Sequence, residues 1–273
     1  MSTYDQALAR CSLPRLEARM LMEHASGRTR TWLIAHGDES VPTVQLASFE
    51  ELVVRRQAGE PMAYLLGSRE FHGLRIEVSP AVLIPRAETE CLVEAALARS
   101  PKGGHLIDLG TGSGAIALAV AHARPDLHIT ATDQSPQALA QAQANAQALG
   151  LDEQLSWRLG SWWSAIPSSQ RFDLVLSNPP YIPALDPHLT QGDLRFEPRQ
   201  ALASGPDGLA ALRDIIAGAA AYLHADGWII LEHGFNQGMA VRQLLSQAGF
   251  KDVRTLSDLA GLDRVSLGRH NRP

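Results

Sequence analysis

A short run after one apolar segment has the residue types to bind a planar nitrogen. Residues 172–177 are predicted to form a strand, which runs directly into Asn178, Pro179, Pro180 and Tyr181. The prolines have no backbone N–H groups, so the Asn178 side chain and nearby carbonyls are left as fixed acceptors. These acceptors can hold the hydrogens of an amide or exocyclic amine, and Tyr181, expected to be exposed, can stack on its planar face. An ordinary Asn-Pro turn leaves the tyrosine unexplained, so we expect all four residues to form the catalytic substrate site.

A second candidate site is a glycine-rich loop at the predicted end of another buried strand. Glycines let the backbone turn tightly and approach a ligand closely, and free N–H groups where the next helix begins favour electron-rich atoms. The alternative is a tight turn that holds nothing. We expect a cofactor loop that consists of Gly110, Thr111, Gly112, Ser113 and Gly114.

An acidic residue follows the glycine loop at the spacing of a ribose ligand. Asp133 ends the next predicted strand, twenty-three residues after Gly110, where a carboxylate can accept hydrogen bonds from two ribose hydroxyls. The alternative is a cap for the helix that is predicted to begin near Ser135. Loop and carboxylate together predict a nucleoside cofactor, but they fit a nicotinamide dinucleotide as well as a methyl donor.

Alternating strands and helices would bring these residues to one edge of a sheet. Strands are predicted at 105–110, 128–133, 155–160, 172–177, 227–233, 252–257 and 264–269, and helices at 115–124, 135–149, 209–224 and 239–248. Repeated crossover helices require a mostly parallel, doubly wound sheet. The last two strands are joined by too short a link for a helix, so they must pair antiparallel. The fold class is therefore α/β, with a Rossmann-like seven-stranded sheet and an antiparallel last strand.

The chain is expected to contain two domains. Residues 1–67 show apolar positions at helical spacing and predict a small helical domain. Such a bundle could serve for packing alone or could recognise a partner, and we expect a substrate-recognition domain. Residues 68–85 read as a β-hairpin linker that turns at Gly73, and residues 86–273 form the domain with the sheet.

Composition excludes several classes of protein. The 273 residues are 45% hydrophobic and 19% charged, without a long apolar run, which favours a cytoplasmic protein with no membrane partner. The two cysteines and ten histidines lack metal-ligand spacing, so no metal site is predicted. A net charge of −5 argues against a stable nucleic-acid partner.

These motifs together resemble a known family. The glycine loop, Asp133 and the Asn-Pro-Pro-Tyr run are similar to those of seven-stranded S-adenosylmethionine methyltransferases that act on planar nitrogens. Nearly the whole chain resembles the peptide-chain release factor glutamine methyltransferases (the PrmC or HemK family). The matching stretches are residues 60–67, 70–71, 83–90, 177–182, 196–199, 201–202 and 207–209. Ala87 and Glu88 depart from the Pro and Asp that are frequent in the family.

The resemblance implies an activity and roles for individual residues. It implies methyl transfer from S-adenosyl-L-methionine to the N5 nitrogen of the glutamine in the Gly-Gly-Gln motif of peptide-chain release factors. The glycine loop and Asp133 would bind the cofactor, Trp162 would pack near its adenine, and Asn178 would contact both its methionine end and the substrate. Without the family, Trp162 and its neighbour Trp163 could equally be core or surface aromatic residues.

Three rival interpretations remain at this point. An adenine-N6 or guanine-N2 methyltransferase acting on nucleic acid would share the Asn-Pro-Pro-Tyr run, but the net acidity disfavours it. A non-catalytic protein that binds S-adenosylmethionine would not need the complete set of site residues. A nicotinamide dehydrogenase fits the glycine loop but leaves Asn178 to Tyr181 without a role.

Overall fold

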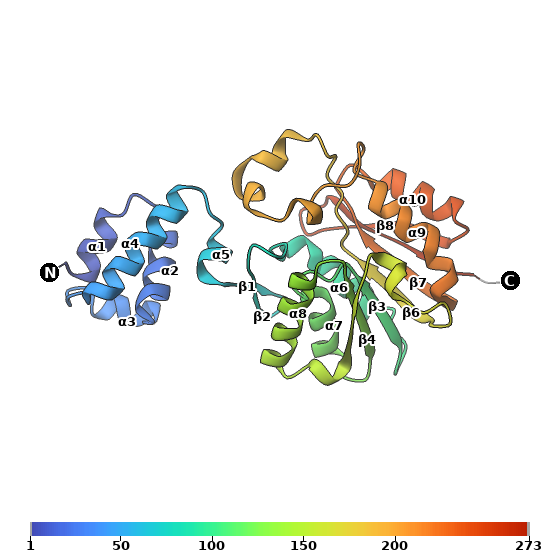
Figure 1. Ribbon diagram of the computed structural model, residues 1–273, viewed down its shortest axis with the longest axis horizontal. Coiled ribbons are helices and arrows are strands. Elements are labelled where there is room, and N and C mark those ends of the chain that lie inside the picture. Colours follow the sequence, from blue (N-terminus) through green and yellow to red (C-terminus); the bar gives the residue numbers. More distant parts are fainter. Residues whose placement is uncertain (1, 272–273) are drawn as a thin grey trace. The chain divides into compact units, whose positions relative to one another are not determined.

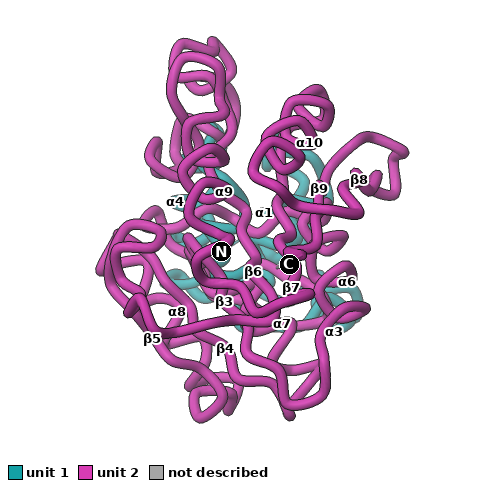
Figure 2. The backbone as a smooth tube through the Cα atoms, turned by 90° about the vertical axis from the view of Figure 1, so that its right-hand side faces the viewer, with its two compact units in different colours: residues 1–68 teal, residues 69–273 magenta. Residues whose placement is uncertain are grey.

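The chain folds into two compact units that divide after Ser68 (Figure 2). The computed structural model describes residues 2–271. Each unit has its own cluster of buried apolar side chains. The units are therefore described one at a time.

Unit 1 is helical. It consists of α1 (Tyr4–Arg10), α2 (Arg15–Ser26), α3 (Arg30–Ala35), α4 (Thr43–Gln57) and α5 (Met62–Leu66). The Thr3 side chain accepts the backbone N–H of Gln6 and so caps the first helix. Leu21 and Met22 of α2 are fully buried in a core that also contains Phe49 of α4. The helical character predicted for this part of the chain is confirmed.

Unit 2 begins with a two-stranded hairpin. Strands β1 (Ser68–Phe71) and β2 (Leu74–Glu77) are joined through His72 and Gly73, which both have positive φ values. Two positive φ values in succession suit the right-handed twist of a hairpin. The buried Asn145 side chain accepts the backbone N–H of Glu77 at 2.9 Å and donates to the Ser113 carbonyl at 2.8 Å. Asn145 thus ties the hairpin to the glycine loop.

The rest of unit 2 is built around a seven-stranded sheet (Figure 1). Its strands are β3 (His105–Leu109), β4 (His128–Asp133), β5 (Leu155–Leu159), β6 (Phe172–Ser177), β7 (Leu223–Glu232), β8 (Lys251–Ser257) and β9 (Asp263–Arg269). Its α-helices are α6 (Glu90–Leu97), α7 (Ala115–Ala123), α8 (Pro136–Leu149), α9 (Ala210–Tyr222) and α10 (Gly238–Gln247). Short 3-10 helices include η1 (Ala87–Thr89), η3 (Trp162–Ala165), η4 (Pro187–Thr190), η5 (Gly192–Phe196) and η6 (Arg199–Ala201).

The order of the strands determines where ligands can bind. The order is β5-β4-β3-β6-β7-β9-β8, and only β9 runs antiparallel to its neighbours. The chain leaves β3 in one direction towards β4 and β5 and returns on the other side as β6. Right-handed connections then place the intervening helices on opposite faces, and a crevice opens at the carboxyl ends of β3 and β6. The predicted doubly wound sheet with an antiparallel last strand is confirmed.

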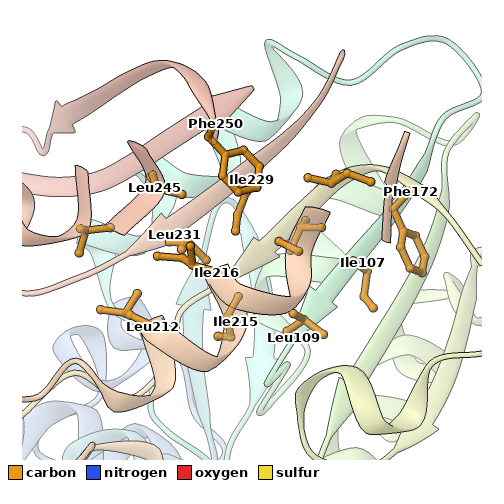
Figure 3. Packing of buried hydrophobic residues seen from close by; sticks show 14 of the residues in the cluster. Ile107, Leu109, Phe172, Leu212, Ile215, Ile216, Ile229, Leu231, Leu245 and Phe250 are labelled. Carbon is orange, nitrogen blue, oxygen red and sulfur yellow. The ribbon is translucent and has the colours of Figure 1, made fainter. Parts of the chain in front are cut away.

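One large core cluster supports this edge of the sheet. Ile107 of β3, Ile215 of α9 and Ile229 of β7 are all fully buried, and they pack together with residues of α10 (Figure 3). Burial of each such side chain stabilises the fold by about 1.5–3 kcal/mol. The strand ends that carry the site are therefore fixed by a rigid core.

Some element boundaries differ from those predicted. Strand β7 begins at Leu223, so α9 ends two residues earlier than expected, and the pairing of β6 with β7 is irregular between Phe172 and Leu174. Asp226 has a positive φ of 63°, which is unusual for a residue other than glycine and marks the irregular start of the strand. Within residues 2–271, no helix is both long enough and apolar enough to cross a bilayer.

Candidate active site

The carboxyl ends of β3, β4, β5 and β6 surround one pocket in unit 2. Its lining includes the glycine loop after β3, Asp133 at the end of β4, Trp162 after β5 and Asn178 after β6. The pocket encloses about 900 Å³ of empty space, part of it open to solvent. The structure therefore brings together candidate residues from four separate parts of the sequence.

The glycine loop has a backbone that only glycine adopts easily. Gly110, Gly112 and Gly114 have φ values of 75°, 58° and 85°. A Cβ atom on Gly114 would lie 3.1 Å from Ala142 Cβ, so this glycine also lets the loop approach α8 closely. The backbone N–H groups of Gly110 and Thr111 both donate to the Thr132 carbonyl, at 2.9 and 2.8 Å. The loop is thus held against the end of β4.

Asp133 binds both the glycine loop and the N-cap residue of α8, but it is not itself the cap of the helix. Its Oδ2 accepts the backbone N–H of Gly112 and its Oδ1 that of Ser135, both at 2.9 Å. The helix α8 is capped instead by the Ser135 hydroxyl, which accepts the backbone N–H of Ala138. Burial raises the pKa of the Asp133 carboxyl, although the hydrogen bonds from the backbone act in the opposite direction and lower it. A carboxylate has about four acceptor sites, so the two backbone donors leave sites for further donors from the pocket.

A second carboxyl group, which the sequence analysis did not single out, lies beneath the loop. Asp108 is fully buried in β3, and its Oδ2 accepts a hydrogen bond from the Thr111 hydroxyl at 2.7 Å. Burial raises the pKa of Asp108 to about 7. The sequence feature that could have identified Asp108 is an acidic residue inside an otherwise apolar strand, because a buried unpaired charge is costly. Asp108 holds Thr111 and so shapes the loop from below.

The two adjacent tryptophans have different positions. Trp162 lines the pocket, and its ring lies against Gly110, where an added Cβ would come within 3.1 Å of it. Trp163 instead donates from its indole N–H to the Ile215 carbonyl at 3.0 Å and stacks on Tyr222. Trp162 is therefore the aromatic surface of the pocket, while Trp163 packs against the core.

Asn178 is held by a hydrogen bond to a residue of η1. Its Nδ2 donates to the Thr89 hydroxyl oxygen at 3.2 Å, and both residues line the pocket. Just before it, the buried Ser177 hydroxyl donates to the Leu109 carbonyl at 2.6 Å and joins the ends of β6 and β3. With its nitrogen engaged, the amide of Asn178 retains its oxygen as an acceptor.

The remaining residues of the turn are less accessible than expected. Pro180 lines the pocket, whereas Pro179 is buried and Tyr181 is not among the described residues of the lining. The expectation of an exposed Tyr181 is wrong, because its ring packs against the core cluster and its hydroxyl donates to Glu232 at 3.3 Å. Burial and the Glu232 charge raise the pKa of Tyr181, which keeps the phenol neutral.

An ion pair with a buried carboxylate joins two segments that border the pocket. Glu197 accepts the backbone N–H of Ile84 at 3.0 Å and pairs with Arg86. Arg86 lines the pocket on one side, and Pro198 lines it next to Glu197. In the sequence, residues 196–199 are distinguished only by their resemblance to the family, because nothing local indicates a partner more than one hundred residues away. Glu197 therefore connects the segment after the hairpin with the loop that follows the Asn-Pro-Pro-Tyr turn.

Comparisons with known proteins agree with this arrangement. A model of the PrmC N-terminal domain matches residues 3–67, and one of the methyltransferase small domain matches residues 87–193. A release factor glutamine methyltransferase of Neisseria gonorrhoeae is 49% identical, with 98% of each chain covered. One of Bordetella pertussis is 51% identical, with 98% of this chain and 99% of the relative covered. This chain belongs to the release factor glutamine methyltransferase family. The resemblance stated from the sequence is confirmed.

A solved structure supports the fold of this family member independently. A methyltransferase from Pyrococcus furiosus superimposes with a TM-score of 0.55 and 15% identity, over 73% of this chain and 90% of that one. At this identity the likeness concerns the fold alone. The predicted class, an S-adenosylmethionine-dependent methyltransferase, is confirmed by the family membership.

The pocket of this family member has features that suit S-adenosylmethionine. The partly buried Asp133 retains acceptor sites for hydroxyl groups, and Trp162 offers an aromatic face. The departure at Ala87 and Glu88 lies in η1, where both side chains are exposed, while the following Thr89 is buried. The residues at positions 87 and 88 therefore differ from those frequent in the family without displacing Thr89, which lines the pocket.

Proposed function

We propose that this protein transfers a methyl group from S-adenosyl-L-methionine to the side-chain amide nitrogen of the glutamine in the Gly-Gly-Gln motif of peptide-chain release factors. The observation that carries the proposal is the Asn178 amide, whose nitrogen is engaged by Thr89 while its oxygen remains an acceptor beside the pocket. The full-length relatives named release factor glutamine methyltransferase support the choice of acceptor.

The cofactor would be bound by residues from all four strand ends. We assign Asp133 to the ribose hydroxyls and Trp162 to the adenine. The loop from Gly110 to Gly114, including Thr111, Gly112 and Ser113, would pack against the cofactor, and Asn178 would contact its methionine end. When bound, S-adenosylmethionine supplies an electrophilic methyl group on a positively charged sulfur.

The protein itself acts mainly by positioning. An amide nitrogen is a weak nucleophile because its lone pair is delocalised, so alignment must lower the barrier. Orientation of this kind can supply about 7–11 kcal/mol. Asn178 Oδ1 and the Pro179 carbonyl would accept the two amide hydrogens, and these bonds strengthen as the nitrogen becomes positive. Pro180 and Tyr181 would shape the slot for the amide, and the proton leaves to water.

The helical unit 1 would contribute to recognition of the release factor. The model that matches residues 3–67 is named for this family, whereas the methyltransferase model matches residues 87–193 of the sheet domain. A Gly-Gly-Gln loop suits a narrow pocket because its glycines adopt backbone conformations closed to other residues. We also propose a cytoplasmic location, where release factors act, and no stable nucleic-acid partner, in keeping with the net charge of −5.

One experiment tests the function directly. The protein is incubated with labelled S-adenosylmethionine and an intact release factor, the same factor with its motif glutamine replaced, or DNA and RNA. Label is expected on the intact factor alone, and mass spectrometry should locate it on the glutamine side chain. Equal labelling of both factors, or preferential labelling of nucleic acid, would contradict the proposal.

A further inference from the structure

The exposed apolar side chains of unit 2 gather at one edge of its sheet. Among the residues that the structure describes, the large apolar side chains that unit 2 exposes all end a strand or lie in the segment that follows one: Leu159, Leu185, Phe235, Met239, Leu259 and Leu262. Strands β5, β6, β7 and β8 run in the same direction, so their carboxyl ends lie at the edge that also carries the pocket. Single exposed apolar residues are ordinary, but a set confined to one edge marks an interaction surface.

Four of these residues come from two segments that meet, and we call them the apolar patch: Phe235, Met239, Leu259 and Leu262. The first two belong to the segment after β7, and the last two to the loop between β8 and β9. The backbone N–H of His233 donates to the Arg264 carbonyl at 3.0 Å, and a Cβ atom on Gly238 would lie 2.5 Å from Oδ2 of Asp263. Figure 1 likewise shows α10 beside β8. The patch is therefore built from neighbouring segments, although they are distant in the sequence.

One buried side chain connects the patch to the Asn-Pro-Pro-Tyr turn. Gln237 donates from Nε2 to the Tyr181 carbonyl at 3.0 Å, and its Oε1 accepts the backbone N–H of Gly234 at 2.8 Å. Phe235 and Met239 lie two positions on either side of Gln237, and they are 61% and 67% exposed. The segment that presents these side chains to solvent is therefore fixed directly to the turn that would receive the substrate amide.

The loop between β8 and β9 is held in place from within. Oδ1 of Asp258 accepts the backbone N–H groups of Ala260 and Leu262, at 2.9 and 3.0 Å, and Oδ2 pairs with Arg264 at 3.1 Å. Leu259, at the tip of this loop, is fully exposed. Because the loop is already ordered, little conformational entropy is lost when its apolar side chain is covered by a partner.

The charges beside the patch are paired within the chain. Asp258 pairs with Arg264, and Asp263 lies 3.7 Å from Arg242. A surface that binds nucleic acid needs cations available to phosphates, whereas this one offers aromatic and aliphatic side chains. Aromatic residues and methionine are enriched in protein interfaces. The chemistry of the patch therefore suits an apolar protein surface.

We propose that the apolar patch binds the surface of the release factor that surrounds its Gly-Gly-Gln motif. This inference rests on the proposed function, because it names the part of unit 2 that holds the protein whose glutamine is methylated. A single glutamine side chain offers little area for recognition. Apolar contact beside the turn supplies affinity that the amide cannot, and it brings the motif to the mouth of the pocket.

The test replaces side chains that are exposed, so the fold should not depend on them. Phe235→Ser and Leu259→Ser are made separately and together. Leu159→Ser is the matched control, because Leu159 is 59% exposed at the end of β5, and β5 and β8 lie at opposite sides of the sheet. Methyl transfer to an intact release factor gives kcat and KM, calorimetry gives cofactor affinity, and thermal melting confirms the fold.

The expected effect is weaker binding of the release factor without a change in the chemistry. Each single variant should raise KM about 5-fold or more, as truncation of an apolar anchor does at many interfaces, and the double variant should raise it further. The value of kcat and the cofactor affinity should stay within about twofold of the wild type, because the patch lies outside the pocket lining. Leu159→Ser should leave KM unchanged.

Other outcomes would overturn the inference. A KM of the double variant within twofold of the wild type would show that the patch does not bind the release factor. An equal rise of KM in Leu159→Ser would show a general effect of lost apolar surface, and a parallel loss of cofactor affinity would show a structural one. A wild type that forms dimers, with a monomeric double variant, would assign the patch to a second copy of this chain. A wild type that does not methylate the release factor would instead refute the proposed function, before any variant is compared.

Discussion

The backbone N–H of Gly112 donates to Oδ2 of Asp133 at 2.9 Å, and this bond joins the glycine loop to the end of the neighbouring strand. The same carboxylate accepts the N–H of Ser135, so one side chain organises both the loop and the start of α8. Its position explains why an aspartate that binds a ribose would also orient the loop that contacts the rest of the cofactor.

Asp133→Ala should weaken S-adenosylmethionine binding at least about 10-fold, because hydrogen bonds to a charged group are each worth about 1.5–3 kcal/mol. Calorimetry measures the affinity. Ser135→Ala is the matched control, since it removes the cap of α8 and should cost about 0.5–2 kcal/mol of stability with little loss of affinity. If Asp133→Ala and Ser135→Ala both lost stability but bound the cofactor equally well, Asp133 would have no role as a ligand.

Two glycines of the loop should respond differently to alanine. Gly112 has open space where a Cβ would lie, so Gly112→Ala should cost only the backbone strain of a positive φ, about 1–2 kcal/mol. Gly110→Ala adds a contact with the Trp162 ring and should also lower cofactor affinity. Urea unfolding and calorimetry measure the two effects. Gly103→Ala, with positive φ and open space outside the pocket, is the control. Equal affinities of the Gly110 and Gly103 variants would contradict the role given to Trp162.

The sequence was sufficient to locate most of the site but not its supporting network. Local patterns predicted the strands, and parallel strands must bring their carboxyl ends to one edge, so the glycine loop, Asp133 and Asn178 could be placed together. Thr89 and Asn178, by contrast, are 89 positions apart and meet only through packing of η1 against the sheet edge. No periodicity or spacing encodes such a contact. The same limitation explains why Tyr181 was expected to be exposed, since its partner Glu232 lies on another strand.

The buried Asp108 should make stability depend on pH. Its pKa is about 7 in the folded protein, against an ordinary value of 3.8. Between about pH 4 and pH 7 the unfolded chain has released this proton while the folded chain retains it. The stabilisation is therefore complete below about pH 4 and is lost as the pH rises through 7, by up to about 1.4 kcal/mol per pH unit.

Asp108→Asn removes this titration and leaves the other groups in place. The free energy of unfolding of the variant, relative to that of the wild type, should increase as the pH rises from 4.5 to 8. Urea unfolding at several pH values measures the difference. A constant difference across that range would show that Asp108 is ionised throughout.

Deletion of residues 2–67 should separate recognition from cofactor binding. The two units have separate cores, and the pocket lies entirely in unit 2. A folded fragment that begins at Ser68 should bind S-adenosylmethionine with nearly the affinity of the whole chain but methylate a release factor much more slowly. Calorimetry and methyl-transfer kinetics give the two values. Unchanged kinetics on the intact factor would show that unit 1 has no part in recognition.

Asn178 should matter more for the chemical step than for binding. In the proposed function, Asn178→Ala removes the acceptor that would orient and polarise the substrate amide. Loss of one preorganised contact of this kind typically lowers kcat about 10²-fold to 10³-fold. Cofactor affinity should fall less, because Asn178 is one of many residues that line the pocket. Asn236→Ala, at an exposed asparagine, is the matched control.

Asn178→Ala leaves the Thr89 hydroxyl without its hydrogen-bond donor, which costs about 1 kcal/mol of stability. Thermal melting must therefore show that Asn178→Ala is still folded at the assay temperature. Single-turnover transfer to a release factor measures the chemical step. A rate within threefold of the wild type would mean that the amide oxygen of Asn178 does not hold the acceptor nitrogen.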